Sequence, residues 1–235
     1  PRDGNTVVTT VDVNIQSVAE EKIAEFNEKH KDGYVEGPGT LHTAALIMNP
    51  QNGEILAMAD YPSFDLNNPR DLTPFYTEEE LEGKSEEDKM DLLNQLWGNF
   101  CVNSTFEPGS TIKPFTVATG LETGKITGNE VYICDGEQVF PGDIHIHCVS
   151  RAGHGEETVE KSLMDSCNDA LMQMAETIGI EDFTTYQSIF GFGEKTNIDL
   201  PGEARTDALM FTGETMKPID LATNSFGQSF NCSMI

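Results

Sequence analysis

Residues 108–115, Pro-Gly-Ser-Thr-Ile-Lys-Pro-Phe, constrain the fold more than any other stretch of this 235-residue chain. A proline and a glycine interrupt any helix that precedes the stretch, and Pro114 is tolerated only in the first turn of a helix. The sequence therefore predicts a helix that begins near Ser110 and ends near Gly124. The expected apolar face of this helix consists of Phe115, Val117, Ala118 and Leu121.

The same stretch brings a hydroxyl and an amine together. Ser110 and Lys113 are three residues apart, so a helix would carry both on one face. A neutral lysine can take the proton of the serine and turn it into a nucleophile. The reference pKa of lysine is about 10.4, so this role requires a pKa lowered by roughly three units, which burial can supply. The alternative is an N-capping serine beside a solvated lysine.

A second motif, Ser166-Cys167-Asn168, follows about fifty residues later. Its hydroxyl could relay a proton to a leaving amine, and its amide could hydrogen-bond a peptide. The alternative is a helix N-cap box formed by Ser166 and Asp169.

Outside the two motifs, the patterns mix helices with a hairpin. Asp12 is a good N-cap for a helix. Two β-compatible runs, residues 43–48 and 54–59, flank the turn sequence Asn-Pro-Gln-Asn-Gly, which predicts a hairpin. Further helices are expected at residues 169–178 and 180–190. The first helix should bury Ile15, Val18, Ala19, Ile23 and Phe26. The chain is therefore expected to form an α+β domain.

The charge excludes several classes of partner. Acidic residues number 40 against 14 basic residues, for a formal net charge of −26. Such a negative surface argues against nucleic acid and anionic membrane as partners. Residues 70–95 hold the longest acidic tract and are interpreted as a solvated insertion.

Several long segments together resemble the transpeptidase domain of class B penicillin-binding proteins. The likeness is closest to the division, elongation and sporulation enzymes of Gram-positive bacteria. The segments that carry it are residues 12–16, 49–58, 106–115, 153–155, 166–168, 190–203 and 225–228.

The resemblance implies an α+β transpeptidase fold of the penicillin-binding and serine β-lactamase type. This fold has a helical subdomain and a five-stranded antiparallel sheet covered by helices. It also implies D,D-transpeptidation, in which a serine acyl-enzyme cross-links the stem peptides of peptidoglycan during cell division or cell-shape growth. Ser110 would be the nucleophile, Lys113 its base, Ser166 a proton relay and Asn168 a substrate-holding group. The implied partners are stem peptides ending in D-Ala-D-Ala, β-lactam antibiotics and a membrane glycosyltransferase. No cofactor is required.

One family signature, Lys-Thr-Gly or Lys-Ser-Gly, is not found. Lys195-Thr196-Asn197 lies in a segment that the family uses as a loop outside the site, and asparagine replaces the glycine. Residues 1–235 are therefore interpreted as a partial domain that stops before the Lys-Thr-Gly strand and is inactive alone. The parent protein is expected at the extracytoplasmic face of the cell membrane, anchored by an upstream segment. The rival readings are a serine β-lactamase, a β-lactam sensor domain and a non-catalytic fragment.

Five cysteines leave three possibilities open. Cys134, Cys148, His154 and Cys167 form a loosely spaced Cys3His set that could hold a structural zinc ion. His145 and His147 are alternative ligands. A Cys134–Cys148 disulfide and buried free thiols are the other readings.

Overall fold

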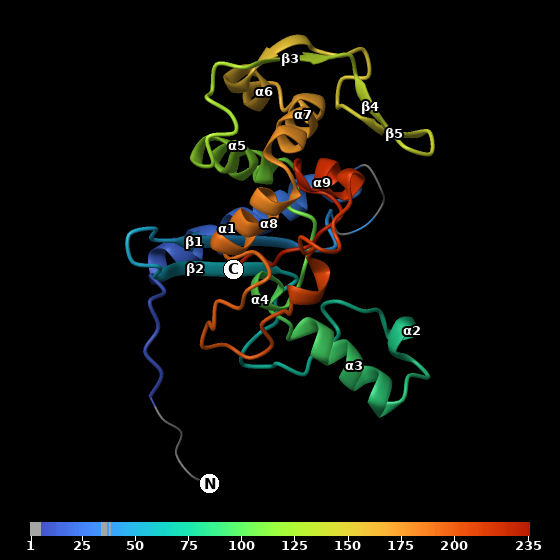
Figure 1. The fold of residues 1–235 in the computed structure, drawn as a ribbon. Helices are drawn as coiled ribbons and strands as arrows, with labels where there is room; N and C mark the ends of the chain where they lie inside the picture. The colour runs from blue at the N-terminus through green and yellow to red at the C-terminus, as the bar shows by residue number, and fades with distance from the viewer. Residues whose placement is uncertain (1–5, 34–36, 38) are drawn as a thin grey trace. The chain divides into compact units, whose positions relative to one another are not determined.

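The computed structural model describes residues 6–33, 37 and 39–235 (Figure 1). Two compact units make up the chain: Pro1–Ser104 with Met234–Ile235, and Thr105–Ser233. Helices and antiparallel strands are mixed, which confirms the α+β class. Within the described residues the strands form three separate two-stranded sheets, so the five-stranded sheet that the resemblance implied is not present in this part of the chain.

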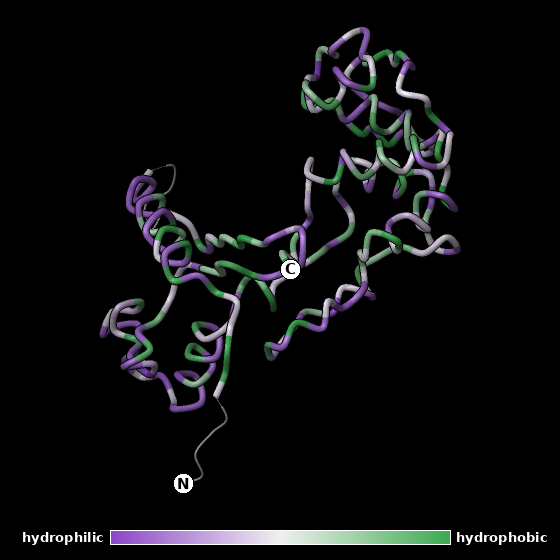
Figure 2. The backbone as a smooth tube through the Cα atoms, turned by 90° about the vertical axis from the view of Figure 1, so that its left-hand side faces the viewer, coloured by the Kyte–Doolittle hydropathy of each residue, from purple (hydrophilic) through white to green (hydrophobic). Residues whose placement is uncertain are grey.

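The helices are short or amphipathic. Hydrophilic residues interrupt the hydrophobic ones along the backbone in Figure 2. Among the residues that the structure describes, no helix has the length and apolar character needed to span a membrane.

The first unit is built on one helix and one hairpin, as predicted. Helix α1 (Val13–His30) begins after Asp12, whose side chain accepts hydrogen bonds from two backbone amides of the first turn. Strands β1 (Thr43–Met48) and β2 (Ile55–Tyr61) pair antiparallel around the predicted turn. Ala19 and Ile23 of α1 pack on the small side chains of β2, which lets the helix approach the sheet closely.

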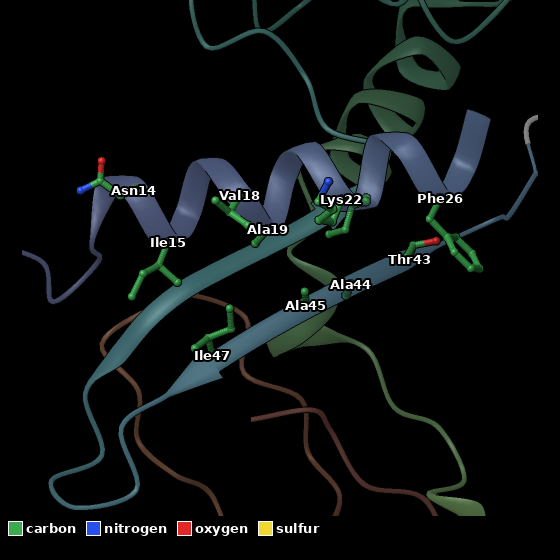
Figure 3. A pocket seen from close by; sticks show the side chains of 11 residues that line it. Asn14, Ile15, Val18, Ala19, Lys22, Phe26, Thr43, Ala44, Ala45 and Ile47 are labelled. Carbon is green, nitrogen blue, oxygen red and sulfur yellow. The ribbon is translucent and has the colours of Figure 1, made fainter. Parts of the chain in front are cut away.

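The predicted stripe of α1 is only partly buried. Val18 and Phe26 are 54% and 45% exposed, so the expectation that they belong to the core was wrong. Both line an apolar pocket of about 600 Å³ between α1 and β1. Figure 3 shows Ile15, Val18 and Phe26 of α1 on one side of this pocket and Ala45 and Ile47 of β1 on the other.

The acidic tract forms two helices, α2 (Glu78–Leu81) and α3 (Glu86–Leu96). Each begins with a capping box, closed by Thr77 and Ser85 respectively. Acidic residues in the first turns also suit the positive ends of the helix dipoles. Behind the charged face, Leu93 and Leu96 pack in a separate apolar cluster with Leu72. Helix α4 (Phe100–Asn103) follows.

The second unit surrounds helix α7 (Asn168–Ile178), which buries seven residues. Strand β3 (Val131–Cys134) pairs with β6 (Gly155–Thr158), and β4 (Glu137–Phe140) pairs with β5 (Ile144–His147). The remaining helical elements are η1 (Gly109–Ile112), α5 (Lys113–Glu122), α6 (Val159–Met164), α8 (Ile180–Ile189), η2 (Asp207–Leu209) and α9 (Pro218–Asn224).

Helix α5 differs from its prediction in two ways. It begins at Lys113, and Ser110 lies in the 3-10 turn η1 before it. Its buried face contains Lys113, Thr116 and Val117, whereas Phe115 and Leu121 are 39% and 46% exposed. Of the predicted apolar face, Val117 is buried whereas Phe115, Ala118 and Leu121 are exposed, because the helix turns its lysine and threonine inward.

Candidate active site and cysteine–histidine cluster

The turn that carries Ser110 is held by backbone contacts with the end of the second unit. The backbone N–H of Gly109 donates to the carbonyl of Gly227 at 2.9 Å. Phe106 and Cys232 exchange two backbone hydrogen bonds in an isolated β-bridge. Gly109 has φ +59 and Gly227 has φ +87, and a Cβ on Gly227 would lie only 2.0 Å from the Gly109 carbonyl oxygen. Ser110 itself stays exposed.

Lys113 is almost completely buried, with 2% of its surface exposed. Its Nζ donates to the carbonyl of Ser166 at 2.6 Å, the hydroxyl of Ser166 at 2.8 Å and the Oδ1 of Asn168 at 2.7 Å. Desolvation by burial lowers the pKa of Lys113 to about 8, although nearby Cys148 and Cys167 oppose the shift. The solvated-lysine alternative is therefore wrong.

The hydroxyl of Ser166 connects the lysine to the first serine. It donates to Ser110 Oγ at 3.0 Å and accepts from Lys113 Nζ at 2.8 Å. Lys113 was expected to act directly on Ser110, whereas in this structure its hydrogen bond runs through Ser166. Ser166 has φ +51, a left-handed conformation that costs a serine roughly 1–3 kcal/mol. The surrounding contacts hold it there.

Asn168 begins α7, but Ser166 does not cap this helix. The N-cap is Cys167, whose Sγ accepts from the backbone N–H of Ala170, so the alternative cap-box reading of Ser166 was wrong. Asn168 accepts from Lys113 and donates from Nδ2 to the carbonyl of His147 at 3.4 Å. Ser110, Lys113, Ser166 and Asn168 thus form one hydrogen-bonded group, as the motifs predicted.

Three residues contribute to this group although no sequence pattern indicates that they do. The carbonyl of His147 is a backbone atom, so its side chain gives no hint of the contact. Gly227 belongs to a segment quoted only for its resemblance. Thr116 is buried and donates to the carbonyl of Ser225 at 2.8 Å, which ties α5 to the residues before Gly227.

The triplet Lys195-Thr196-Asn197 is held elsewhere. The carboxylate of Glu203 accepts from the backbone and hydroxyl of Thr196 and from the backbone of Asn197. These bonds close a local loop.

A cysteine–histidine cluster adjoins the second motif. The ligand atoms of Cys134, Cys148, His154 and Cys167 all lie within 4.8 Å of one another. His154 Nδ1 is 3.6 Å from the Sγ of Cys134 and 3.6 Å from the Sγ of Cys148, and the sulfurs of Cys148 and Cys167 are 3.8 Å apart. A tetrahedron with Zn–S bonds of about 2.3 Å and Zn–N bonds of about 2.05 Å has edges of about 3.8 Å (S–S) and about 3.6 Å (S–N). Three of the six distances between the ligand atoms therefore match the edges of a zinc tetrahedron, and the other three are no longer than 4.8 Å.

The thiols differ in how readily they ionise. Burial opposes ionisation of Cys148, but hydrogen bonds from the backbone of Asp169, Ser150 and Asn168 and from the Cys167 side chain outweigh it and lower the pKa of Cys148. Burial raises the pKa values of the Cys134 and Cys167 thiols. All five cysteines are free thiols here, so the Cys134–Cys148 disulfide is not formed.

His145 and His147 do not join the cluster. Their Nδ1 atoms lie 3.0 and 3.1 Å from one oxygen of Glu137. Hydrogen bonds with the carboxylates of Glu137 and Asp143 raise the pKa of His145. The interpretation of these histidines as alternative metal ligands was therefore wrong.

The chain is similar to known proteins in sequence and in fold. Residues 43–235 match the family model of the penicillin binding protein transpeptidase domain. Stage V sporulation protein D of Bacillus subtilis is 32% identical over 236 residues, covering 100% of this chain and 32% of that protein. Peptidoglycan D,D-transpeptidase MrdA of Acinetobacter baumannii is 29% identical over 205 residues, covering 87% of this chain and 27% of that protein.

Solved structures show the same fold. The crystal structure of Pseudomonas aeruginosa PBP2 in complex with WCK 5153 aligns with a TM-score of 0.73 at 24% identity, covering 95% of this chain and 48% of that one. A peptidoglycan glycosyltransferase from Burkholderia ambifaria aligns with the same TM-score at 23% identity, covering 96% of this chain and 57% of that one. The chain spans about a third of the length of the curated relatives it matches. It belongs to the penicillin-binding protein transpeptidase domain family.

Proposed function

We propose that this chain carries the acylating residues of a peptidoglycan D,D-transpeptidase. The observation that supports this most strongly is the hydrogen-bonded chain from Ser110 through Ser166 to a buried Lys113. The name of one relative agrees with it, because MrdA of Acinetobacter baumannii is a peptidoglycan D,D-transpeptidase.

In the first step, Ser110 Oγ attacks the penultimate D-Ala carbonyl of a stem peptide that ends in D-Ala-D-Ala. Its proton passes through the hydroxyl of Ser166 to Lys113, and the backbone N–H of Ser110 stabilises the oxyanion. The C–N bond to the terminal D-Ala breaks, and Ser166 returns the proton to the leaving nitrogen. In the second step, an amine of another stem peptide attacks the ester carbonyl and gives a proton through Ser166 to Lys113. The C–O bond to Ser110 breaks, and the proton returns through Ser166 to Ser110 Oγ.

The pKa of Lys113 makes this path workable near neutrality. A pKa of about 8 leaves about a tenth of the amine neutral at pH 7, against roughly one part in 2,500 for an unperturbed lysine. The amine of Lys113 donates one hydrogen bond to Asn168 Oδ1 and another to the hydroxyl of Ser166, and these two bonds fix its position.

The wider assignments belong to the same proposal. The parent protein acts in cell-wall synthesis at the extracytoplasmic face of the membrane, is anchored by a segment outside this chain and works with a membrane glycosyltransferase. β-Lactams acylate the same serine. Residues 70–95 are an insertion in the domain, and residues 1–235 are one part of it. The names of the curated relatives support the cell-wall role.

Labelling by a fluorescent penicillin tests the function. The intact protein that contains this chain should be labelled covalently, the Ser110→Ala variant should not, and Ser188→Ala, an exposed serine of α8, should label like the wild type. Absence of labelling in the wild type would refute the proposal. The fate of the label separates the rivals, because a transpeptidase keeps its penicilloyl ester for a long time whereas a β-lactamase hydrolyses it rapidly.

We also propose that Cys134, Cys148, His154 and Cys167 hold a structural zinc ion. Three distances between ligand atoms that match the edges of a zinc tetrahedron support this, as does the lowered pKa of Cys148. Such an ion supplies folding free energy and takes no part in acyl transfer. It would join β3, the end of the β4–β5 hairpin and the start of α7.

Metal analysis tests the zinc site. The purified protein should contain one zinc per chain, Cys134→Ser should lose it, and Cys101→Ser should keep it because Cys101 is a buried thiol outside the cluster. A cobalt-substituted sample should show the absorption of tetrahedral thiolate coordination. A wild-type protein that binds neither metal would contradict the proposal.

A further inference from the structure

Asp169 follows the catalytic motif directly and is fully buried, with 0% of its surface exposed. Among the described residues no cation pairs with it, yet three neutral donors surround its carboxylate. Oδ1 accepts from the side-chain amides of Gln138 at 2.6 Å and Gln173 at 2.9 Å, and Oδ2 accepts from the backbone N–H of Asp135 at 3.2 Å. Burial of a carboxylate is costly, and an apolar side chain would fill the space at lower cost.

The donors show what this carboxylate holds. Asp135 lies in the turn after β3, Gln138 lies in β4, and Asp169 lies in the first turn of α7. Gln173 also donates to the carbonyl of Ile133 at 2.8 Å, so this group of hydrogen bonds includes β3. Asp169 therefore fastens the beginning of the β4–β5 hairpin to the helix that starts with Asn168. Figure 1 labels the elements concerned, α7, β4 and β5.

The β4–β5 hairpin links Asp169 to the active site. In the register of β4 and β5, Glu137 lies opposite His147, one residue from Gln138. The N–H of Cys148 donates to the carbonyl of Gly136 at 2.8 Å, which continues the pairing beyond His147. The place of the His147 carbonyl thus depends on where Asp169 holds β4.

That carbonyl and the amine of Lys113 together decide which way the amide of Asn168 faces. A carbonyl only accepts hydrogen bonds, so Nδ2 must point to His147 and Oδ1 must point to Lys113. With the amide reversed, an NH2 group would face the amine of Lys113. We infer that Asp169 is a positioning residue for acylation, which acts through the hairpin and the His147 carbonyl to hold Asn168 Oδ1 on Lys113. This inference rests on the proposed transpeptidase function.

The test variant is Asp169→Asn in the intact protein. Asparagine keeps the size of the side chain but replaces one acceptor oxygen with an NH2 donor, which then faces one of the donors. Stopped-flow labelling with a fluorescent penicillin gives three separate quantities: the amplitude, the half-saturating concentration and the limiting acylation rate. A purely structural defect lowers the amplitude, because fewer molecules are folded, and leaves the limiting rate of the remaining molecules unchanged.

We expect the limiting rate of Asp169→Asn to fall about tenfold, because small displacements of catalytic groups have large kinetic effects. The half-saturating concentration should stay within about twofold of wild type. Gln138→Leu, which removes only the link to β4, should show a smaller loss in the same direction. Glu176→Gln, an exposed residue on the same helix with the same change of charge, should match the wild type.

A double-mutant cycle completes the test. In an Asn168→Ala background, Asp169→Asn should cause no further loss of the limiting rate, because the group it positions is gone. Additive losses, or an unchanged rate in the single variant, would overturn the inference. The proposed function fails on a different result, namely that the wild type is not acylated at Ser110 at all.

Discussion

The two turns that supply hydroxyl groups to the site are held by different kinds of contact. The Ser110 turn is fixed by backbone hydrogen bonds with Gly227 and Cys232. The backbone hydrogen bonds of the Ser166 turn are local, to the carbonyls of Ser162 and Leu163 in the preceding helix. Side chains link it to the rest of the site: Lys113 binds its carbonyl and its hydroxyl, and Cys167 caps the helix that follows. A turn held by backbone atoms tolerates most side-chain changes unless a new Cβ enters the contact. A turn held by side chains depends on the identity and charge of each one.

This difference predicts where the site is fragile. The Ser110 turn should be displaced when the close approach of two backbones is blocked. The Ser166 turn should be displaced when a buried polar group is removed or reversed. The variants below distinguish the two kinds of dependence.

The largest effect is expected for Lys113→Met, which affects the side-chain-held turn. Methionine fills similar space but cannot accept a proton, so the acylation rate should fall by about 10³-fold. The thermal midpoint should change little, because the free energy saved by not burying an ammonium is offset by the loss of the donor to the Ser166 carbonyl and to Asn168 Oδ1. Lys125→Met, an exposed lysine beyond the same helix, is the matched control. An acylation rate near wild type would remove Lys113 from the mechanism.

Gly227→Ala breaks the backbone-held turn. The added Cβ would collide with the Gly109 carbonyl oxygen, and φ +87 disfavours any L side chain. We expect the acylation rate to fall about 100-fold as the Ser110 turn is displaced, together with a lower thermal midpoint. Gly213→Ala serves as the control, since its Cβ would meet only Thr184 Oγ1 at 3.6 Å. Equal effects of the two substitutions would show that the backbone contact is unimportant.

Thr116→Val should give the smallest effect. Valine keeps the shape of threonine but leaves the buried carbonyl of Ser225 without its donor, which costs about 1–3 kcal/mol of the free energy of unfolding. Denaturant titration measures this loss. Thr177→Val, an exposed threonine whose hydroxyl donates to Gln173, should change stability by less than about 0.5 kcal/mol. A Thr116→Val protein as stable as wild type would mean that α5 does not depend on the bond to Ser225.

The sequence predicted local features well. Asp12 caps α1, the hairpin surrounds the turn sequence, and the residues of both motifs come together. Each of these follows from signals within a few residues or from the resemblance. The Cys3His set was one of three readings of the cysteines, and the structure brings its four ligand atoms within 4.8 Å of one another.

Features that depend on distant contacts could not be predicted. The buried face of α5 is set by the acceptors around Lys113, which the apolar pattern of Phe115 and Leu121 does not reveal. The exposure of Val18 depends on which segments pack against α1. The direction of the Asn168 amide depends on a backbone carbonyl some twenty residues earlier in the chain. Ser166 was read as a possible N-cap because the sequence does not show that it takes a left-handed backbone.

The pH dependence of the acylation rate tests the central claim most directly. The reactive form of Lys113 is neutral, and its pKa is lowered to about 8. The limiting rate for a penicillin should therefore rise about tenfold per pH unit below pH 8 and level off above it. A rate that is flat between pH 6 and pH 9, or one that rises only above about pH 10 where a normal lysine loses its proton, would contradict the account.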